Sequence, residues 1–340
     1  MGMNLTAMKR TAGALVGPGK GILAADESSG TIEKRFKGIG VTSTEENRRA
    51  YRDLLFTTPG VGEFISGVIL FDETLRQKAL NGTPFVEVLK KQGIIPGIKV
   101  DEGAKALAGF PGEKITEGLD GLRERLGEYV KLGARFTKWR AVITIGSSIP
   151  TRTCLHANAH ALARFAALSQ EAGLVPIVEP EVLMDGDHTI ERNFDVTEAL
   201  LKFVFQQLYE HRVALEAMLL KPNMVVSGKE CSKQASVKEA AEMTLRCLRQ
   251  AVPPAVHGVV FLSGGQSETQ ATEHLNEMNR INNVPWQLSF SYGRALQDSA
   301  LKTWKGDPKN LAAAQKAFNR RARCNSAARS GKYTSDMERP

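Results

Sequence analysis

The sequence predicts a (β/α)8 barrel in one domain. Eight short runs of mainly apolar residues alternate with segments of helical periodicity along the 340 residues. Strands that alternate with helices form βαβ units with a parallel sheet, and eight units in one chain indicate closure into a barrel. α/β barrels commonly reach this length undivided. We therefore expect one barrel domain over residues 1–340, with a mobile polar tail at 331–340.

The expected strands and helices follow one another in regular order. The strands cover residues 21–26, 67–73, 97–100, 135–143, 174–182, 217–225, 258–265 and 286–293. Helical candidates include residues 44–55, 156–173, 196–214, 237–250, 294–304 and 309–330. A doubly wound open sheet is the alternative, and it is disfavoured because no dinucleotide-type glycine fingerprint follows the first strand.

Composition and charge narrow the classes of function. The formal net charge is +8, but the basic residues are spread along the chain among 37 acidic ones, and aromatic residues make up only 6%. The clustered basic surface of a nucleic-acid-binding protein is therefore not indicated. A positive field of this kind also attracts small anions such as sugar phosphates.

Neither a membrane protein nor a secreted protein is indicated. No run approaches the about 18 apolar residues of a membrane span, and the start MGMNLTAMKR lacks the apolar stretch of a signal peptide. The four cysteines (Cys154, Cys231, Cys247 and Cys324) show no C-x-x-C spacing, which argues against a disulfide framework and a structural zinc site. We expect a cytoplasmic protein with free thiols and no membrane partner.

Charged residues collect at the ends of the expected strands, where a barrel of this kind forms its active site. In chain order these ends carry Asp26, Asp72, Glu73, Lys99, Asp101, Lys138, Arg140, Glu179, Glu181 and Lys221. A charge inside an apolar strand is costly to bury unless it is paired, so the set as a whole indicates a site. Lys221 alone, in AMLLKPNMVV, fits a structural ion pair as well as a catalytic role, and the pairs 138/140 and 179/181 also fit buried ion-pair layers.

Three further motifs do not indicate the sites that they resemble. His156 and His160 in HANAH are four residues apart on a helical candidate, but the motif lacks the Glu of a zinc-binding H-E-x-x-H, so we expect no metal site. VGPGKG lacks the first glycine and the Ser or Thr of a phosphate-binding Walker loop. LSGGQ matches the signature of ABC-type ATPases, but these enzymes also need a Walker loop. Because no such loop is present, LSGGQ is better explained as the end of a strand.

A phosphate site is expected after the seventh and eighth strands. Ser263, Gly264 and Gly265 form a turn whose N–H groups can face an anion, and Ser291, Gly293 and Arg294 follow at the next strand end, just before a helix. The loops after strands seven and eight often bind phosphate in such barrels. A second anion site near Lys99, Arg35 and the hydroxyls of ESSG would suit a substrate with a phosphate at each end.

Six segments together resemble a known family: GKGILAADES, FTKWR, PIVEPE, LLKPNMV, LSGGQSE and SYGRALQ. In this order and spacing, from about Thr11 to about Tyr333, they closely resemble class I fructose-bisphosphate aldolase, the Schiff-base, metal-independent type. The resemblance implies a (β/α)8 barrel without a cofactor that cleaves fructose 1,6-bisphosphate reversibly to dihydroxyacetone phosphate and glyceraldehyde 3-phosphate. It also implies a role in glycolysis and gluconeogenesis and a homotetramer.

The resemblance assigns roles to individual residues. Lys221 would form the imine, Glu179 with its neighbour Glu181 would act as acid and base there, and Asp26 would act on the hydroxyl beside the broken bond. Lys138, Lys99 and Arg140 would be cationic site residues. Ser263, Gly264, Gly265, Ser291, Gly293 and Arg294 would bind one phosphate, while Ser28, Thr31, Arg35 and Arg48 match positions around the other end of the sugar.

The chemistry sets requirements on these groups. Lys221 attacks a carbonyl only when neutral, and we expect the apolar AMLL run and the charge of Lys138 to disfavour its ammonium form. We expect repulsion from Glu181 to raise the pKa of Glu179. The chain ends in Arg339 and Pro340 rather than in the tyrosine typical of animal and plant members. Another Schiff-base barrel enzyme, or a binding protein that retains the site, remains as an alternative.

Overall fold

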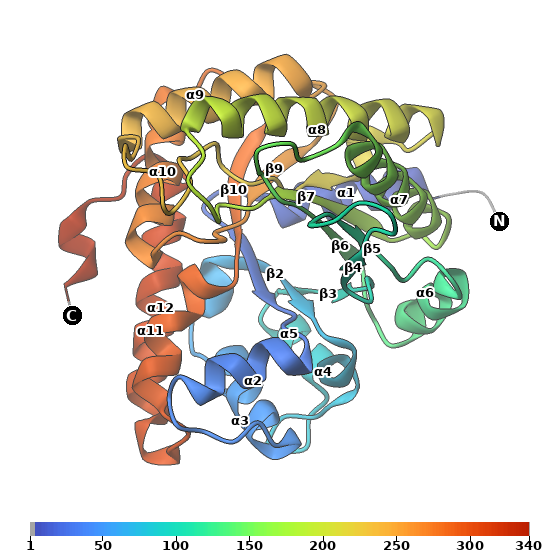
Figure 1. Cartoon of the computed structure of the whole chain (residues 1–340). Coiled ribbons are helices and arrows are strands. Elements are labelled where there is room, and N and C mark those ends of the chain that lie inside the picture. The colour runs from blue at the N-terminus through green and yellow to red at the C-terminus, as the bar shows by residue number, and fades with distance from the viewer. Residues whose placement is uncertain (1–3, 340) are drawn as a thin grey trace.

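Eight parallel strands close into a barrel in the computed structural model, which describes residues 4–339 (Figure 1). Around the barrel their order is β1, β10, β9, β8, β7, β6, β3, β2. Their bounds are β1 (Gly21–Ala25), β2 (Ile65–Leu70), β3 (Ile95–Lys99), β6 (Phe136–Ile143), β7 (Val175–Val182), β8 (Leu219–Leu220), β9 (Gly258–Phe261) and β10 (Gln287–Tyr292). Each overlaps one predicted run, so the predicted fold class is confirmed.

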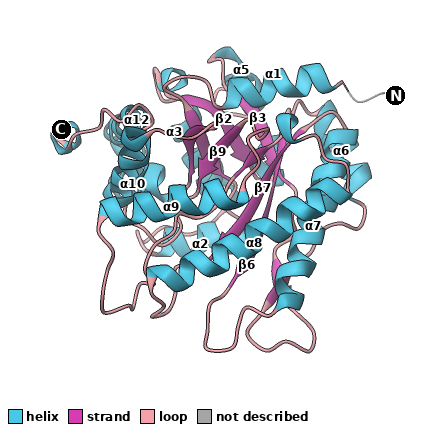
Figure 2. Cartoon of the chain, turned by 90° about the horizontal axis from the view of Figure 1, so that it is seen from above, coloured by secondary structure: helices cyan, strands magenta, loops and turns pink. Residues whose placement is uncertain are grey.

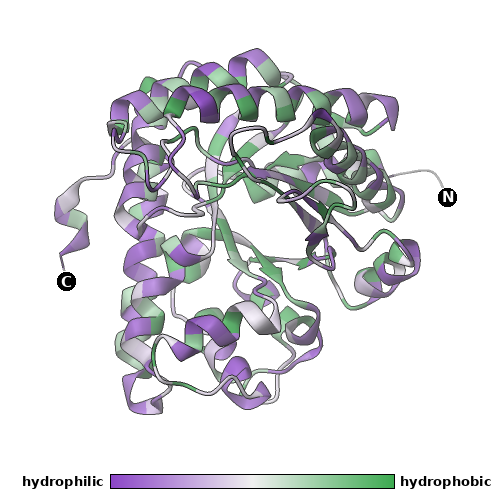
Figure 3. Ribbon diagram, in the orientation of Figure 1, coloured by the Kyte–Doolittle hydropathy of each residue, from purple (hydrophilic) through white to green (hydrophobic). Residues whose placement is uncertain are grey.

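Helices cover the outside of the barrel (Figure 2). They are α2 (Ser29–Lys37), α3 (Glu45–Phe56), α4 (Asp72–Arg76), α5 (Phe85–Lys91), α6 (Leu122–Lys131), α7 (Arg152–Glu171), α8 (Ile190–Glu210), α9 (Val237–Ala251), α10 (Glu268–Ile281), α11 (Arg294–Trp304) and α12 (Leu311–Ala328). Along them hydrophobic and hydrophilic residues alternate (Figure 3), as expected of helices that pack one face on a barrel. No helix within residues 4–339 has the length and apolar character needed to cross a membrane.

Helix α1 (Leu5–Leu15) precedes the first strand and, like α2, α4, α5, α6 and α10, is not among the helices predicted from the sequence. The Asn4 side chain caps it by accepting a hydrogen bond from Ala7 N at 3.1 Å. Its buried residues Met8, Ala12 and Leu15 pack in one cluster with inward-facing residues of the strands. Because the active site of such a barrel lies at the opposite, C-terminal end of the strands, α1 contributes to stability.

A two-stranded antiparallel hairpin, also not predicted, follows β3 and consists of β4 (Ala104–Ala106) and β5 (Lys114–Thr116). Thr116 Oγ1 donates to Arg140 O at 2.8 Å. The Glu113 carboxylate accepts from both the backbone N–H and the hydroxyl of Thr151, each at 2.6 Å, just before α7 begins. These bonds fix the hairpin against β6 and α7.

The tail begins with ordered contacts. Tyr333 is buried, and its hydroxyl donates to Glu338 at 3.0 Å. Glu338, in the short 3-10 helix η4 (Ser335–Glu338), also pairs with the buried guanidinium of Arg321 on α12. The mobility expected of residues 331–340 stays a prediction.

Large and small side chains fit together inside the barrel. Phe136 of β6 lies opposite Gly97 of β3 in the parallel register. A Cβ on Gly97 would lie 2.3 Å from the Phe136 ring, and one on Gly67 would lie 3.1 Å from it. The interior therefore holds the Phe136 ring only because its neighbours have no side chain.

We predict that Gly97→Ala destabilises the protein by about 2–3 kcal/mol, since the extra methyl overpacks the interior. Phe136→Leu added to it should recover part of the loss. Urea unfolding monitored by circular dichroism measures both. Gly127→Ala is the matched control, because a Cβ there meets nothing within 4 Å on helix α6 and should be neutral or stabilising. A Gly97→Ala protein as stable as the wild type would contradict this account.

Candidate active site

A cavity of about 610 Å³ opens at the C-terminal ends of the strands. Fifteen of the residues selected from the sequence line it: Asp26, Ser28, Thr31, Arg35, Lys99, Lys138, Arg140, Glu179, Glu181, Lys221, Ser263, Gly264, Ser291, Gly293 and Arg294. They come from parts of the chain that are far apart in sequence, and closure of the barrel brings them together.

Lys138 forms the centre of the site. Its Nζ lies 2.7 Å from Asp26 Oδ2, 3.3 Å from Glu179 Oε2 and 3.9 Å from Asp101 Oδ2. Burial alone would lower the pKa of Lys138, but the carboxylates of Asp26, Glu179 and Asp101 outweigh burial and hold that pKa above its ordinary value. Lys138 is therefore a fixed positive charge inside the site.

Lys221 shares a carboxylate with Lys138. Its Nζ lies 3.2 Å from Glu179 Oε1, and its side chain is 5% exposed. The backbone N–H of Lys221 donates to Val178 O at 2.8 Å, which continues the pairing of β8 with β7. The Nζ atoms of Lys138 and Lys221 thus lie near opposite oxygens of one buried carboxylate.

The expected rise in the pKa of Glu179 is wrong. Burial acts in that direction, but the charges of Lys138, Lys221 and Arg140 outweigh it and hold the pKa of Glu179 below its ordinary value. Glu181 does not supply the expected repulsion, because its carboxylate pairs with Arg140 Nε. The pKa of Asp26 is lowered as well, since Lys138 and Lys221 outweigh the effect of its burial. Both carboxyl groups are therefore ionised in the free protein.

Side chains alternate in direction along β6. Lys138 and Arg140 line the cavity. Trp139, between them, points outward and stacks on Phe165 of α7 with ring centroids 5.7 Å apart. Trp139 is fully buried and anchors β6 to its covering helix, which fixes the direction of Lys138.

One side of the cavity can hold an anion. Ser291 Oγ is buried and has no hydrogen-bond partner within residues 4–339, although it lines the cavity. Gly293 directly precedes helix α11, and Arg294 is the first residue of that helix. A free hydroxyl, a helix N-terminus and a guanidinium suit a phosphate group. Gly265 has φ +82°, which explains the glycine, but it does not line the cavity.

The residues selected for the other end of the sugar separate in space. Ser28 and Thr31 hydroxyls lie 3.1 Å apart at the cavity wall. Arg35 lies beside Gly293, where a Cβ would be 3.6 Å from Arg35 Nη2. Arg48 does not line the cavity, since it donates to Glu73 through Nε at 2.8 Å and Nη2 at 2.6 Å.

Sequence reasoning listed Asp101 among the strand-end charges without giving it a role, and it missed Glu27. Asp101 bonds to Lys138 and lies 3.4 Å from Lys99, and Glu27 pairs with Arg35 and with Arg52. Each residue is the second one after a strand end, in AADES and IKVDEG, and both line the cavity. Their position just after a strand end could have identified both as site residues, because an acidic residue there lies at the same end of the barrel as the basic site residues.

The loop of Ser263 is supported from behind. Gln266 N donates to Ser263 O at 3.2 Å, and Gln266 Oε1 lies 2.7 Å from His274 Nδ1 on α10. His274 is 2% exposed, and burial lowers its pKa to about 4. A neutral imidazole therefore holds the Gln266 side chain under the loop.

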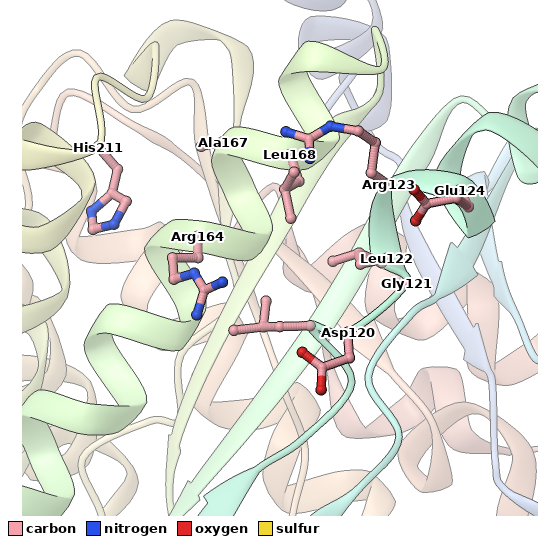
Figure 4. A pocket seen from close by; sticks show the side chains of 10 residues that line it. Asp120, Gly121, Leu122, Arg123, Glu124, Arg164, Ala167, Leu168 and His211 are labelled. Carbon is pink, nitrogen blue, oxygen red and sulfur yellow. The ribbon is translucent and has the colours of Figure 1, made fainter.

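A second cavity, of about 500 Å³, lies outside the barrel between α6 and α7, with His211 at its edge (Figure 4). Its Arg123 is largely exposed and pairs with Glu171 at 2.7 Å. His160 lies exposed on α7, with its ring 5.1 Å from that of His211. Within residues 4–339 no three His, Cys, Asp or Glu side chains are grouped to hold a metal ion. The charged cavity inside the barrel is thus the candidate active site.

Comparison with known proteins identifies the family. A family model described as "Glycolytic: Fructose-bisphosphate aldolase class-I" matches residues 7–340. The chain belongs to the class I fructose-bisphosphate aldolase family. It is 60% identical over 332 residues to the probable fructose-bisphosphate aldolase class 1 of Xanthomonas campestris pv. campestris, covering 97% of this chain and 99% of the relative. It is 55% identical over 329 residues to fructose-bisphosphate aldolase of Dictyostelium discoideum, covering 96% and 92%.

A solved structure supports the same relationship. The Plasmodium falciparum aldolase, in a ternary complex with TRAP and a small-molecule inhibitor, superposes with a TM-score of 0.96 at 52% identity. The match covers 97% of this chain and 96% of that one. The family resemblance stated from six sequence segments is confirmed over nearly the whole chain.

His274 should make stability depend on pH. Its pKa is about 4 in the folded protein and about 6.5 in the unfolded chain, so the unfolded chain binds the proton more tightly. The stability that His274 contributes is complete above pH ~6.5 and is lost as the pH falls towards ~4, by about 2 kcal/mol between pH 7 and pH 5. Urea unfolding at both pH values should show a smaller loss for His274→Asn than for the wild type. Equal losses would contradict this assignment.

Proposed function

We propose that this aldolase cleaves fructose 1,6-bisphosphate reversibly to dihydroxyacetone phosphate and glyceraldehyde 3-phosphate through an imine on Lys221. One observation carries the mechanism: the Glu179 carboxylate lies between Lys221 Nζ and Lys138 Nζ, at 3.2 Å and 3.3 Å. In this position the Glu179 carboxylate can accept a proton from Lys221. The charge of Lys138 keeps Glu179 ionised before that transfer.

Imine formation needs Glu179 in two roles. The carboxylate first takes a proton from the Lys221 ammonium, and the neutral amine attacks the C2 carbonyl of the ketose. The resulting carbinolamine loses its hydroxyl as water when the protonated Glu179 returns that proton. The lowered pKa of Glu179 fits this order, because the group begins as a base and becomes an acid only after Lys221 has given up its proton.

Bond cleavage needs a base at the C4 hydroxyl. Asp26, ionised beside Lys138, takes the hydroxyl proton as the C3–C4 bond breaks, and the bond's electron pair passes to the protonated imine. Glyceraldehyde 3-phosphate leaves as the aldehyde, and an enamine remains on Lys221. Protonation of the enamine carbon and hydrolysis then release dihydroxyacetone phosphate. The Tyr333 hydroxyl is bonded to Glu338 and does not line the cavity.

Family membership also supports finer proposals. We place the enzyme in glycolysis and gluconeogenesis, in the cytoplasm, and as a homotetramer that needs neither a cofactor nor a metal ion. The ratio of kcat/KM on fructose 1,6-bisphosphate and fructose 1-phosphate will give its substrate preference. Multi-angle light scattering will give the number of subunits.

Trapping should locate the imine. Incubation with dihydroxyacetone phosphate and reduction with borohydride should leave a stable adduct on Lys221, found by peptide mass spectrometry, because reduction fixes the imine as an amine. Lys221→Arg should give no adduct and no cleavage. Lys302→Met is the control, since Lys302 is largely exposed and pairs with Asp298 at 2.6 Å. An adduct on another lysine, or full activity without an adduct, would overturn the mechanism.

Removal of the Lys138 charge should change the pH profile. Both Asp26 and Glu179 work as ionised bases, so activity is lost as the pH falls through their pKa values, which Lys138 helps to keep low. In Lys138→Met these pKa values rise, and the acid limb of kcat/KM should move up by about one to two pH units. Residual activity with an unmoved acid limb would show that Lys138 does not control these carboxylates.

A further inference from the structure

Two prolines interrupt the pairing of β7 with β8 beside Lys221. Lys221 N donates to Val178 O at 2.8 Å, and in a parallel ladder the return bond to Lys221 O comes from the second residue after Val178. That residue is Pro180, which has no N–H, and Pro222 likewise cannot donate. This explains why the paired residues of the two strands end at Val178 and Leu220.

The Asn223 side chain replaces a bond of the interrupted ladder. If the ladder continued, Val182 N would donate to the backbone oxygen of Asn223, but it donates instead to the side-chain Oδ1 at 2.9 Å. Both residues are buried, so water does not compete for this bond. The end of β7 is thus joined through a side chain to the segment after β8, two residues beyond Lys221.

Contacts with α8 fix the orientation of the Asn223 amide. Because a backbone N–H can only donate, Oδ1 must face Val182, and Nδ2 needs acceptors on its other side. Nδ2 donates to Thr197 Oγ1 and to Met224 O, each at 3.1 Å. The Thr197 hydroxyl donates in turn to Asn193 Oδ1 at 3.3 Å. A flipped amide would place Nδ2 against the N–H of Val182, so one orientation is selected.

The same chain of bonds ends on a buried histidine. Asn193 Nδ2 lies 3.3 Å from His188 Nε2, and burial lowers the pKa of His188, so a neutral ring can accept there. Asn193 and Thr197 belong to α8, which packs against β7, and both are buried. The Asn223 amide is therefore held by a network anchored on the helix that follows β7.

Other bonds hold the segment after β8 on its far side. Leu262 N, just after β9, donates to Pro222 O at 3.1 Å, and Val225 N donates to Thr244 Oγ1 of α9 at 2.9 Å. These two bonds join the segment to β9 and α9, and neither of them reaches β7. The position of the segment relative to β7 therefore depends on Asn223.

We propose that Asn223 is a positioning residue that holds Lys221 Nζ at the Glu179 carboxylate, with Thr197 keeping the Asn223 amide in the required orientation. The inference rests on the proposed function, in which Lys221 gives its proton to Glu179 and then attacks the carbonyl. The two groups lie 3.2 Å apart on neighbouring strands, and a displacement of about 1 Å can slow a reaction about a hundredfold. Asn223 does not line the cavity, so it acts through the backbone that carries Lys221.

Two variants test this role. Asn223→Ala removes the bond to Val182, and Thr197→Val keeps that bond but removes one acceptor of Nδ2. The rate of imine formation with dihydroxyacetone phosphate, measured by rapid mixing and borohydride trapping, should fall about tenfold or more in Asn223→Ala and about threefold to tenfold in Thr197→Val. The calorimetric Kd of hexitol 1,6-bisphosphate, which has no carbonyl, should stay within about twofold of the wild-type value, because the variants displace only the reacting groups.

The matched control is Thr244→Val. It also removes a buried threonine hydroxyl that holds the segment after β8, but the lost bond, from Val225 N, does not reach β7. Its stability in urea should fall about as far as that of Thr197→Val, while its imine forms at the wild-type rate. Equal slowing in both threonine variants, or wild-type imine formation in Asn223→Ala, would overturn the proposal. A Kd of the hexitol that rises as much as the rate falls gives Asn223 a structural role only.

Crystal structures of the variants separate this proposal from the proposed reaction. In Asn223→Ala, Lys221 Nζ should lie beyond about 4 Å from Glu179 Oε1, and an unchanged distance of 3.2 Å would contradict the proposal. If the wild type gives no adduct on Lys221, the proposed reaction fails, and this distance still decides the role of Asn223. If Asn223→Ala does not fold, the same measurements on Thr197→Val decide.

Discussion

The ion cluster around Lys138 is the interaction on which the rest of the site depends. Asp26, Asp101 and Glu179 all lie within 4 Å of its ammonium group, in a part of the barrel where each charge has lost most of its water. Without Lys138, Asp26 would lose the one ion-pair partner that it has within residues 4–339, and Glu179 and Asp101 would keep only Lys221 and Lys99. A buried carboxylate without a partner costs several kcal/mol to keep ionised. The ends of β1, β3, β6 and β7 must therefore stay in register around this one side chain. The stability of the mouth and the chemistry proposed for Lys221 have the same origin.

The barrel supplies the rigidity that this cluster needs. Parallel pairing runs without a gap around the strands, so that no strand can shift without breaking hydrogen bonds on both sides. Trp139 fixes β6 from outside against α7, and the Phe136 ring fills the interior between glycines. A lysine held from so many directions keeps its charge in one place. Fixed charge near the reacting carbon is what an enzyme of this kind needs from its scaffold.

The side of the cavity that suits an anion, unlike the cluster around Lys138, is not neutralised by its own carboxylates. It is built from loops and a helix N-terminus after β9 and β10, where the buried Ser291 hydroxyl has no hydrogen-bond partner within residues 4–339 and Arg294 begins α11. Glu27, which pairs with Arg35 and with the buried Arg52, lines the same cavity. The catalytic half of the cavity is thus neutralised within itself, and the anion half is left positive. This asymmetry suits the proposed substrate, which carries both a carbonyl and phosphate groups.

The sequence by itself determined the eight strands, most of the covering helices and the set of charged residues at the strand ends. These features are local: apolar runs, turn residues and helical periodicity act over a few neighbours. Only the tertiary structure decided which charges meet. It set the charges of Lys138, Lys221 and Arg140 around Glu179, so that the pKa of Glu179 falls instead of rising. It also turned Arg48 to Glu73 and brought Arg35 beside Gly293. Each of these contacts joins residues from separate strands, helices or loops, and a side chain's partners there depend on the closure and register of the barrel, which no short stretch of sequence encodes.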